Sequence, residues 1–539
     1  MDQPVDGMRA VVSKSGLHVT GPTQDAPTRV VEVLAYDGLM TGAVYGPVIA
    51  AEARALVESL AAGRDPGGPD APWLAVAALP GGGLAAAAST MLPSGLFWSA
   101  SSGVLIVASD PASARGASTG IDPDYIREFA AGVVPPGRTP FLDVHRVPAG
   151  ATARWATPDS APALAHWSGP RAWPEPHLRG PGAMAAYLDA FDGVLRGLAA
   201  RCGSVVTTVS GGLDSTFVAA GLARLASDES PVLGLTYAPL AAAHVAAAPG
   251  VDADESALAA MLAQQYPGRL AIEVVTNAGL VRPLHAAALT ARRGGVPLFN
   301  PANEPWLSSM RESAADAGAR MLFVGTNGNA AFSFEHGYAA RYSLARGRFG
   351  DLVRMARDPD GRLTSASVRR RVLGPLRRQA TAGTSDRAAF LAWLARERTG
   401  IAAAANPAAT RGVLMADPFS ARAVLEVAAA IDPAEWQVGG RGRGFARRAG
   451  QGRVPDAIRL RSSRGQQGRD AWYVIRNDRD EYLDRIAGLP SVPGLAGVDA
   501  GRLSAHVAAW PWGEAHGPAW PEHVAVDRLL GVAEFAGIW

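Results

Sequence analysis

The chain has 539 residues, of which 48% are hydrophobic and 19% charged, and its formal net charge is +2. This length suits two or more domains, and the apolar share excludes a disordered chain. The near-neutral charge gives no indication of binding to nucleic acid or to a membrane surface. A single cysteine, Cys202, excludes a disulfide framework and a cysteine-rich zinc site.

The N-terminus, Met1-Asp2-Gln3-Pro4, has neither the basic nor the apolar region of a signal peptide. No stretch of about 18 uninterrupted apolar residues occurs in the chain. We therefore expect a cytoplasmic protein that has no membrane span and no nucleic-acid partner.

Short apolar runs separated by turn residues recur in the first third of the chain. They lie at 73–79, 84–89, 96–100 and 104–108, with Pro80-Gly81-Gly82-Gly83 and Pro93-Ser94-Gly95 among the turns. Evenly spaced short strands of this kind predict stacked antiparallel sheets. A helix is predicted over 125–131, and a hairpin is predicted from 141–146 and 151–155 around Pro148-Ala149-Gly150.

A Pro- and Gly-rich stretch at 166–182 has no periodicity and is typical of a linker. It divides a front domain, 1–167, from a longer back domain, 183–539. The back domain alternates helix and strand, with helices predicted at 183–200, 215–226, 254–265 and 304–318, and strands at 204–209, 231–238, 271–276 and 321–325. Strands with helical crossovers predict an α/β fold with a parallel sheet and helices on both faces, and the pattern is mostly helical from about residue 341.

One loop carries the clearest chemistry. The β-branched run that ends at Val209 leads into Ser210-Gly211-Gly212-Leu213-Asp214-Ser215-Thr216, after which a helix is predicted to begin. The two glycines let the backbone approach an anion closely, and the free N–H groups and dipole of the helix favour phosphate.

The same loop offers a carboxylate, Asp214, that can hold Mg²⁺ against the departing phosphates. We therefore assign nucleotide binding to Val209, Ser210, Gly211, Gly212, Asp214, Ser215 and Thr216. The loop is not a Walker A loop, because no Gly-Lys-Ser/Thr follows and Lys14 is the only lysine in the chain.

These residues resemble the asparagine synthetase superfamily over nearly the whole chain. The string 210–216 matches the family's SGGLDS loop, and further matching segments are 233–237, 254–256, 323–330 and Asp417-Pro418-Phe419. The front part, especially 139–150, resembles the glutaminase domain of that family. The resemblance implies an N-terminal Ntn-hydrolase-like β-sandwich and a C-terminal PP-loop ATPase domain that forms C–N bonds from ATP with Mg²⁺, releasing AMP and pyrophosphate. It also brings Leu235, Val324 and Gly325 into the nucleotide site.

Three departures from the family pattern bear on function. Glutamine-dependent members begin with Met-Cys, whereas position 2 here is Asp2, so the front domain is expected to be a degenerate glutaminase. Asn329 stands where the family has its second metal-binding Asp, which makes Asp214 and Asn329 the expected metal ligands. The late catalytic lysine is absent, and Arg464 is expected to supply its positive charge.

These departures resemble one branch, the macrolactam synthetases that close lasso peptides. Strings of the type G-x-x-G-N-x-x-x-S and R-G-x-Q-x-x-D-W match 325–333 and 464–472, with Ala471 as an insertion before the tryptophan. The implied reaction adenylates an Asp or Glu side chain of a precursor peptide and closes the ring with the peptide's N-terminal amine. Glu335 or His336 is expected to accept the amine proton, beside Asp214 and Arg464 as catalytic residues.

The implied partners are the precursor peptide and, with it, a leader peptidase and a leader-binding protein. Two alternatives stay open: a β-lactam synthetase-like ligase for a small molecule, and a catalytically inactive paralogue that only binds a peptide. His336 also fits a surface or capping histidine, and Arg464 a structural ion-pair partner.

Overall fold

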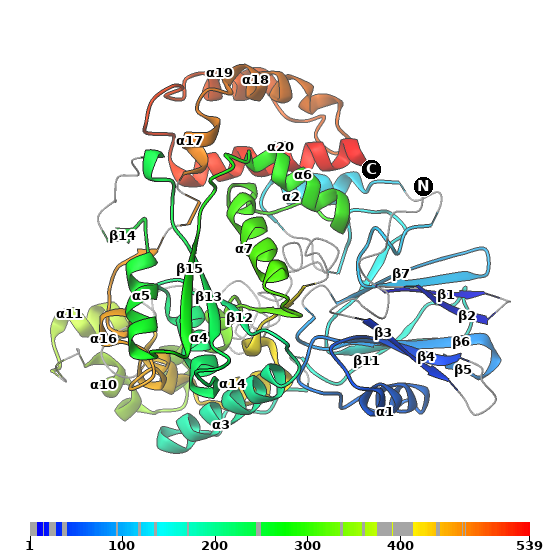
Figure 1. Cartoon of the computed structure of the whole chain (residues 1–539), viewed down its shortest axis with the longest axis horizontal. Helices are drawn as coiled ribbons and strands as arrows, with labels where there is room; N and C mark the ends of the chain where they lie inside the picture. Colours follow the sequence, from blue (N-terminus) through cyan, green and yellow to red (C-terminus); the bar gives the residue numbers. More distant parts are fainter. Residues whose placement is uncertain are drawn as a thin grey trace.

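A computed structural model describes the chain except for residues 1–7, 14–15, 21–28, 35–39, 93–94, 117–119, 134–136, 170–171, 244–249, 335–337, 358–359, 361, 374–390, 392–412, 438–441, 466 and 469. It is a mixed α/β structure, as predicted. Figure 1 shows the β-rich front part, in blue and cyan, beside the α/β back part, in green to orange.

The front part contains two antiparallel sheets. One has the order β2-β1-β8-β7-β9 and the other the order β11-β10-β6-β5-β4-β3. Their strands are β1 (Arg9–Ser13), β2 (Gly16–Thr20), β3 (Arg29–Leu34), β4 (Met40–Gly46), β5 (Leu74–Leu79), β6 (Gly83–Ala88), β7 (Leu96–Ser101), β8 (Val104–Ala108), β9 (His145–Val147), β10 (Ala151–Trp155) and β11 (Ala163–His166).

Alternation along each strand decides which core a side chain joins. In β5, Leu74 and Val76 belong to the large core that also contains Leu105 and Val107 of the other sheet. Their neighbours on β5, Ala75 and Ala77, pack instead with helix α1 (Ala50–Ala61) on the opposite face. The predicted strands of this region are therefore confirmed. Along β5, alternate side chains pack against the other sheet on one face and against α1 on the opposite face.

The predicted hairpin around Gly150 is wrong. β9 pairs with β7 in the first sheet, whereas β10 pairs with β6 and β11 in the second. Gly150 has a φ of 82° and donates its amide to Ala88 O over 3.2 Å, so the turn passes the chain from one sheet to the other.

The back part is built on a five-stranded parallel sheet of order β15-β13-β12-β16-β17. Its strands are β12 (Val206–Thr208), β13 (Val232–Tyr237), β15 (Leu270–Val275), β16 (Met321–Phe323) and β17 (Leu414–Ala416). The predicted parallel sheet is confirmed, but β17 was not predicted. It lies in the region after residue 341 that was predicted to be mostly helical, and its pairing with β16 places it in the sheet.

Helices cover both faces of this sheet. Helices α3 (Gly180–Ala199), α4 (Leu213–Leu225), α5 (Ser256–Gln265) and α14 (Arg422–Ala430) share the large core with Phe323 and Ala416. Helix α7 (Glu304–Asp316) packs on the other face with Leu322 and Val324.

The C-terminal helices form a layer with two helices from earlier in the chain. Helices α17 (Ala471–Ile475), α18 (Arg479–Gly488), α19 (Ala500–Ala508) and α20 (Trp520–Ile538) share a second core with α2 (Pro123–Ala130) and α6 (Pro283–Gly294) (Figure 1). This core contains residues on both sides of the linker, so the domain limits 1–167 and 183–539 stay a prediction. No helix in the described ranges is long and apolar enough to cross a bilayer.

Candidate functional site

The glycine loop joins the central strand β12 to helix α4. The amide of Val209 donates to Leu235 O over 2.7 Å, which continues the β12–β13 ladder to the carboxyl edge of the sheet. Helix α4 then begins at Leu213. Ligands bind at this edge in open parallel sheets, and β12 is the middle strand of the five.

Hydrogen bonds inside the loop fix its shape without any ligand. Ser215 Oγ accepts the amide of Ser210 over 3.0 Å and lies 2.7 Å from Ser210 Oγ. Ser210 Oγ accepts the amide of Gly212 over 3.2 Å, and Thr216 Oγ1 donates to Ser210 O over 2.6 Å. Because the N-cap residue of α4, Gly212, has no side chain, the first-turn amides of this helix stay available for an anion.

Three glycines lie where a Cβ would fit only if a neighbouring group moved. A Cβ at Gly211 would lie 2.6 Å from Arg461 Nη1 and 2.8 Å from Glu255 Oε1. A Cβ at Gly325 would lie 2.7 Å from the backbone N of Ser215, and one at Gly328 would lie 2.6 Å from Asp214 Cβ. The loop after β16 therefore lies directly against the first turn of α4, and the two loops form one surface.

Asp214 is the carboxylate of this surface. Its side chain is 13% exposed, its Oδ2 accepts the hydroxyl of Ser333 over 3.1 Å, and Arg443 Nη1 lies 4.0 Å from the same oxygen. Burial raises the pKa of Asp214 to about 6, although the Arg443 charge and the Ser333 hydrogen bond favour the ionised form. At neutral pH the carboxylate is still mostly ionised, so it can bind a cation.

A second carboxylate, Asp417, follows β17 and ties the two loops together. It is 4% exposed, and its two oxygens accept the amides of Asn327, over 2.6 Å, and Phe419, over 3.0 Å. Burial raises the pKa of Asp417 to about 7, and the nearby Asp214 charge adds to this rise. Asp417 holds the 325–328 loop in position.

Two buried oxygen atoms in these loops fit a bound cation. Asp214 Oδ1 and Asn327 Oδ1 have no hydrogen-bond partner among the described residues. Mg²⁺ takes oxygen ligands and keeps few protein ligands when phosphates bind it as well. Consistent with that, the described part of the chain contains no cluster of three or more His, Cys, Asp or Glu side chains suited to a metal. Asn329 lies on the short helix α8 (Gly328–Ala331) and is exposed, so its role as a ligand stays a prediction.

Two arginines converge on the loops. Arg443 has a left-handed backbone, with a φ of 59°, between Gly442 and Gly444. Strain of this kind in a non-glycine residue is typical of functional sites. Arg461 is held beside Gly211 by ion pairs with Glu255 and with Asp252, the latter at 3.4 Å.

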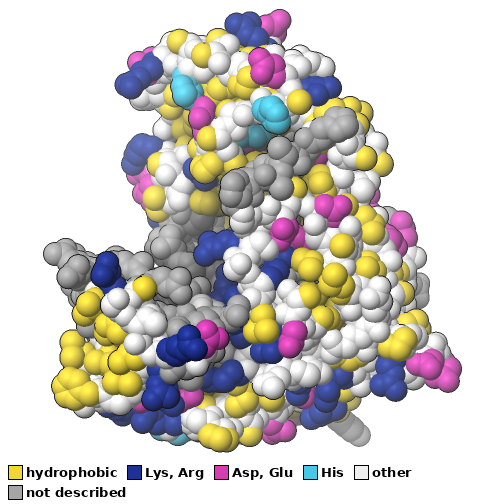
Figure 2. All heavy atoms as spheres, turned by 90° about the vertical axis from the view of Figure 1, so that its left-hand side faces the viewer, with side chains coloured by type: hydrophobic (Ala, Val, Ile, Leu, Met, Phe, Trp, Pro, Cys, Tyr) yellow, Lys and Arg dark blue, Asp and Glu magenta, His cyan; other side chains and the backbone are white. Residues whose placement is uncertain are grey.

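Basic side chains also gather on one face of the molecule. Figure 2, which views the side of the molecule that carries α5 and α16 (Asp456–Arg459), shows Lys and Arg side chains gathered around a hollow at mid-height. A positive hollow of this kind suits an anionic substrate such as a nucleotide.

Arg464 lies elsewhere in the same segment. It begins the short strand β18 (Arg464–Gly465), which pairs with β14 (Val251–Asp252), and it is exposed. The structure thus places Arg461, rather than Arg464, against the glycine loop. Arg464 as the catalytic cation stays a prediction.

The end of the 464–472 string is anchored to the sheet. Asp470, which is buried, accepts the hydroxyl of Tyr237 at the end of β13 and the amide of Leu240 over 3.1 Å. Burial and the Asp470 charge raise the pKa of Tyr237, so its hydroxyl stays a donor. This bond fixes the late segment beside the carboxyl edge.

The sequence-based assignments divide into three groups. The loop residues 209–216, together with Leu235, Val324 and Gly325, lie at or beneath the carboxyl edge of the sheet, with Leu235 and Val324 buried. Glu335 and His336 fall outside the described residues. Asn327, Ser333, Asp417, Arg443 and Arg461 were not assigned to the site from the sequence. The only signal for Asp417 was its place before Pro418-Phe419, and for Asn327 and Ser333 their place in the 325–333 string.

A family model described as asparagine synthase matches residues 201–521, which is more than half of the chain. No curated protein matches the sequence. The matched range begins just before β12 and includes both loops, Asp417, and the two arginines that converge on Asp214 and Gly211.

Proposed function

The chain belongs to the asparagine synthase family, which implies ATP-dependent formation of C–N bonds, and we propose that it is a lasso peptide cyclase. In this proposal the enzyme adenylates an Asp or Glu side chain of a precursor peptide. The peptide's N-terminal amine then displaces AMP and closes a macrolactam. The observation that carries the ligase part is the contact between the two loops at Asp214.

The site residues have distinct tasks in the activation step. The first-turn amides of α4 and the preformed turn at Ser210 receive the phosphates of ATP. Asp214, whose Oδ1 has no partner among the described residues, would hold Mg²⁺, which supplies charge neutralisation to the departing pyrophosphate, and Asn327 Oδ1 in the adjoining loop is a second candidate ligand. Arg443 and Arg461 place two further positive charges at the loops, where the chain has no lysine.

The ring-closing step needs placement more than a special nucleophile. Well-oriented intramolecular reactions reach effective molarities of about 10⁵–10⁸ M. The amine loses a proton as it attacks the acyl carbon, and Glu335 and His336 are the residues that we propose to accept it. Water has to be excluded from the acyl-adenylate during this step, because hydrolysis would compete with the amine.

Two sequence strings support a peptide as the substrate. The 325–333 string supplies Gly325, Gly328 and Ser333, all of which contact the first turn of α4 or Asp214. The 464–472 string lies beside the same edge and is anchored there through Asp470. Both strings resemble those of macrolactam synthetases, the second with Ala471 as an insertion, and this resemblance is the reason for proposing a peptide substrate.

The proposal is tested by incubating the full-length protein with ATP, Mg²⁺ and the candidate precursor peptide encoded beside its gene, without its leader. We expect a product that is lighter by one water and carries a new Asp or Glu side-chain amide, together with equimolar AMP and pyrophosphate. Addition of a leader peptidase and a leader-binding protein is expected to permit the same reaction on the uncut precursor.

The controls separate the alternatives. Asp214→Ala is expected to abolish both AMP release and ring formation. AMP release with a small amino acid derivative, and none with any peptide, would indicate a small-molecule ligase of the β-lactam synthetase kind. Peptide binding without AMP release in the wild-type protein would indicate an inactive paralogue.

A further inference from the structure

We propose that Arg447 is a positioning residue for ATP activation, because its guanidinium holds in place the two arginines that converge on the glycine loop, Arg443 and Arg461. This inference rests on the proposed function, since it assumes that the phosphates of ATP bind at that loop. It deepens that function by explaining how two long, flexible cations can replace a lysine that the site does not have.

The guanidinium of Arg447 is bonded to the main chain at all three of its nitrogens. Arg447 lies on the short helix α15 (Gly444–Ala449), and its Nε donates to Gly442 O over 2.7 Å. Its Nη1 donates to Arg459 O, and its Nη2 donates to Arg461 O over 3.2 Å. These carbonyls belong to two segments, one directly before α15 and the other at the end of α16. The side chain therefore fastens the two segments to each other.

Two bonds of Arg447 enclose the backbone of Arg443. The bond from Nε to Gly442 O holds the peptide group before Arg443, and the amide of Arg447 donates to Arg443 O over 3.1 Å. Arg443 has a φ of 59° and a ψ of 40°, a left-handed conformation that a non-glycine residue keeps only where its surroundings hold it. Arg447 supplies bonds on both sides of this residue, whose Nη1 lies 4.0 Å from Asp214 Oδ2.

The remaining bonds fix the segment that presents Arg461. Arg459 returns a bond to Arg447, because its Nη1 donates to Arg447 O over 3.1 Å, so the two residues are joined in both directions. Two positions further on, the carbonyl of Arg461 accepts Nη2 of Arg447. The side chain of Arg461 pairs with Glu255 and lies against Gly211. Arg461 is thus held by its backbone on one side and by its guanidinium on the other.

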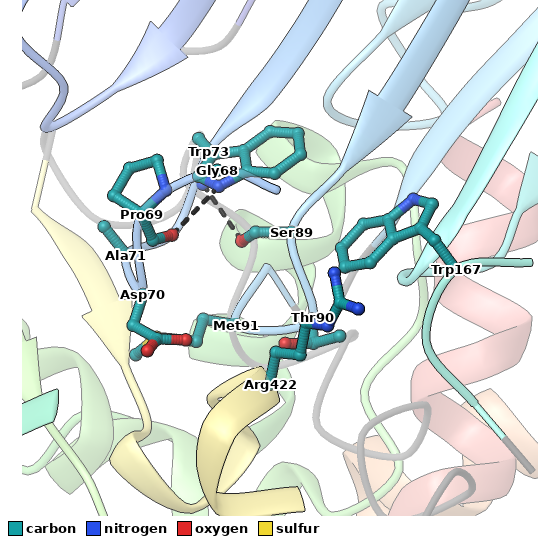
Figure 3. Close-up of a pocket in the computed structure, with 10 residues that line it drawn as sticks. All are labelled: Gly68, Pro69, Asp70, Ala71, Trp73, Ser89, Thr90, Met91, Trp167 and Arg422. Atoms are coloured by element: carbon teal, nitrogen blue, oxygen red, sulfur yellow. Dashed lines mark hydrogen bonds between the residues drawn. The ribbon is translucent and has the colours of Figure 1, made fainter. Parts of the chain in front are cut away.

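Arg422 shows a different use of an arginine, at the boundary between the front and back parts. Its guanidinium bonds the carboxylates of Asp65 and Glu426 and lies 5.4 Å from the ring of Trp167. Figure 3 shows this guanidinium beside Trp167. Such ion pairs set one charge against another, whereas the bonds of Arg447 go to uncharged carbonyls. We therefore expect the forked geometry of Arg447 to matter more at the site than its charge.

The test measures ATP–pyrophosphate exchange by full-length variants in the presence of the precursor peptide. A hydrogen bond to a charged group contributes about 10- to 100-fold to affinity, so misplacing Arg443 and Arg461 in Arg447→Met should raise the KM for MgATP about 10-fold. A smaller folded fraction would lower kcat and leave KM unchanged. A raised KM therefore identifies a positioning effect.

Arg447→Lys separates geometry from charge. Lysine keeps the charge but has a single nitrogen, which cannot occupy the three donor positions of the guanidinium at once. The KM of Arg447→Lys should therefore lie close to that of Arg447→Met, and a wild-type KM would overturn the inference. Arg447→Lys also carries the test if Arg447→Met does not fold, because it preserves the apolar stem and the charge.

Arg154→Met is the matched control. Arg154 lies on β10 of the front part and also donates to main-chain carbonyls, those of Leu60 and, over 3.3 Å, Ala61 at the end of α1. The variant removes the same kind of bond away from the glycine loop, so its KM for MgATP should equal the wild-type value. A rise as large as that of Arg447→Met would overturn the inference, because it would make the effect a general one.

A double-mutant cycle with Arg461→Gln shows whether Arg447 acts through Arg461. The effects of Arg447→Met and Arg461→Gln on the logarithm of KM should combine to less than their sum, because Arg447 has less to position once the Arg461 charge is gone. Additive effects, or a wild-type KM in a folded Arg447→Met protein, would overturn the inference alone. Absence of exchange by the wild-type protein would overturn the proposed function and this inference with it.

Discussion

The Ser333 hydroxyl donates a hydrogen bond to the Asp214 carboxylate over 3.1 Å, joining the end of the loop after β16 to the first turn of α4. The two residues are 119 positions apart in the chain, and their contact lies at the site that we propose for the nucleotide and its cation. It also links the glycine loop to the 325–333 string.

Replacing Asp214 by Asn should separate function from stability. The change removes the anionic metal ligand, so ATP–pyrophosphate exchange should fall by about 10²-fold or more. It also removes a partly buried charge, so the metal-free protein should unfold at the same or a higher temperature. Exchange of labelled pyrophosphate and thermal unfolding measure the two effects. Ser333→Ala, the matched milder change, should reduce exchange less, and normal exchange in Asp214→Asn would count against the assigned site.

A methyl group at Gly325 should disturb both loops. Its Cβ would lie 2.7 Å from the backbone N of Ser215 and 2.8 Å from the backbone C of Asp214, and backbone atoms cannot move aside cheaply. We expect Gly325→Ala to lower the free energy of unfolding by about 1–3 kcal/mol and to weaken MgATP binding. Gly350→Ala is the control, because Gly350 has no atom within 4 Å of its Cβ position and lies in helix α10 (Phe349–Ala356). Equal effects of the two variants would contradict the close packing of the loops.

Arg461 should contribute more to ATP activation than Arg464. Arg461→Gln removes a charge beside Gly211 and leaves the nearly buried Glu255 without its partner, so exchange should fall by about 10- to 100-fold. Arg461→Lys keeps the charge but loses the forked geometry, so its exchange rate should lie between those of the wild type and Arg461→Gln. Arg127→Gln, on the exposed face of α2, is the control. A larger loss from Arg464→Gln than from Arg461→Gln would return the role to Arg464.

The metal-free protein should lose stability as the pH rises from about 4 to about 7. Burial raises the pKa of Asp214 to about 6 and of Asp417 to about 7, above the ordinary value of 3.8. The folded protein then holds protons that the unfolded chain releases. The stabilisation is therefore complete below about pH 4 and is lost as the pH rises through the pKa values of the two carboxyls in the folded protein. The free energy of unfolding should fall by a few kcal/mol across this window.

Urea unfolding between pH 5 and pH 8 measures this slope. Asp214→Asn combined with Asp417→Asn should make it shallower, and the remaining slope is expected from Asp110, whose pKa burial also raises to about 6. Saturating MgATP should remove the part of the slope that comes from Asp214, because the ligand binds its ionised form. An unchanged slope in the double variant would assign the pH dependence to other groups.

Local patterns determined much of the fold in advance. The strand at 104–108 and the loop 210–216 between a strand and a helix were predicted from alternation, β-branching and glycine placement, and the structure has them. These features depend on neighbours along the chain, so the sequence contains their cause. The family of the back part also follows from such a continuous string.

Tertiary structure alone decided the rest. The chain passes at Gly150 from β9 in one sheet to β10 in the other, β17 joins the parallel sheet beside β16, and Arg461 rather than Arg464 reaches Gly211. Each of these depends on groups distant in the chain, whose approach no local period records.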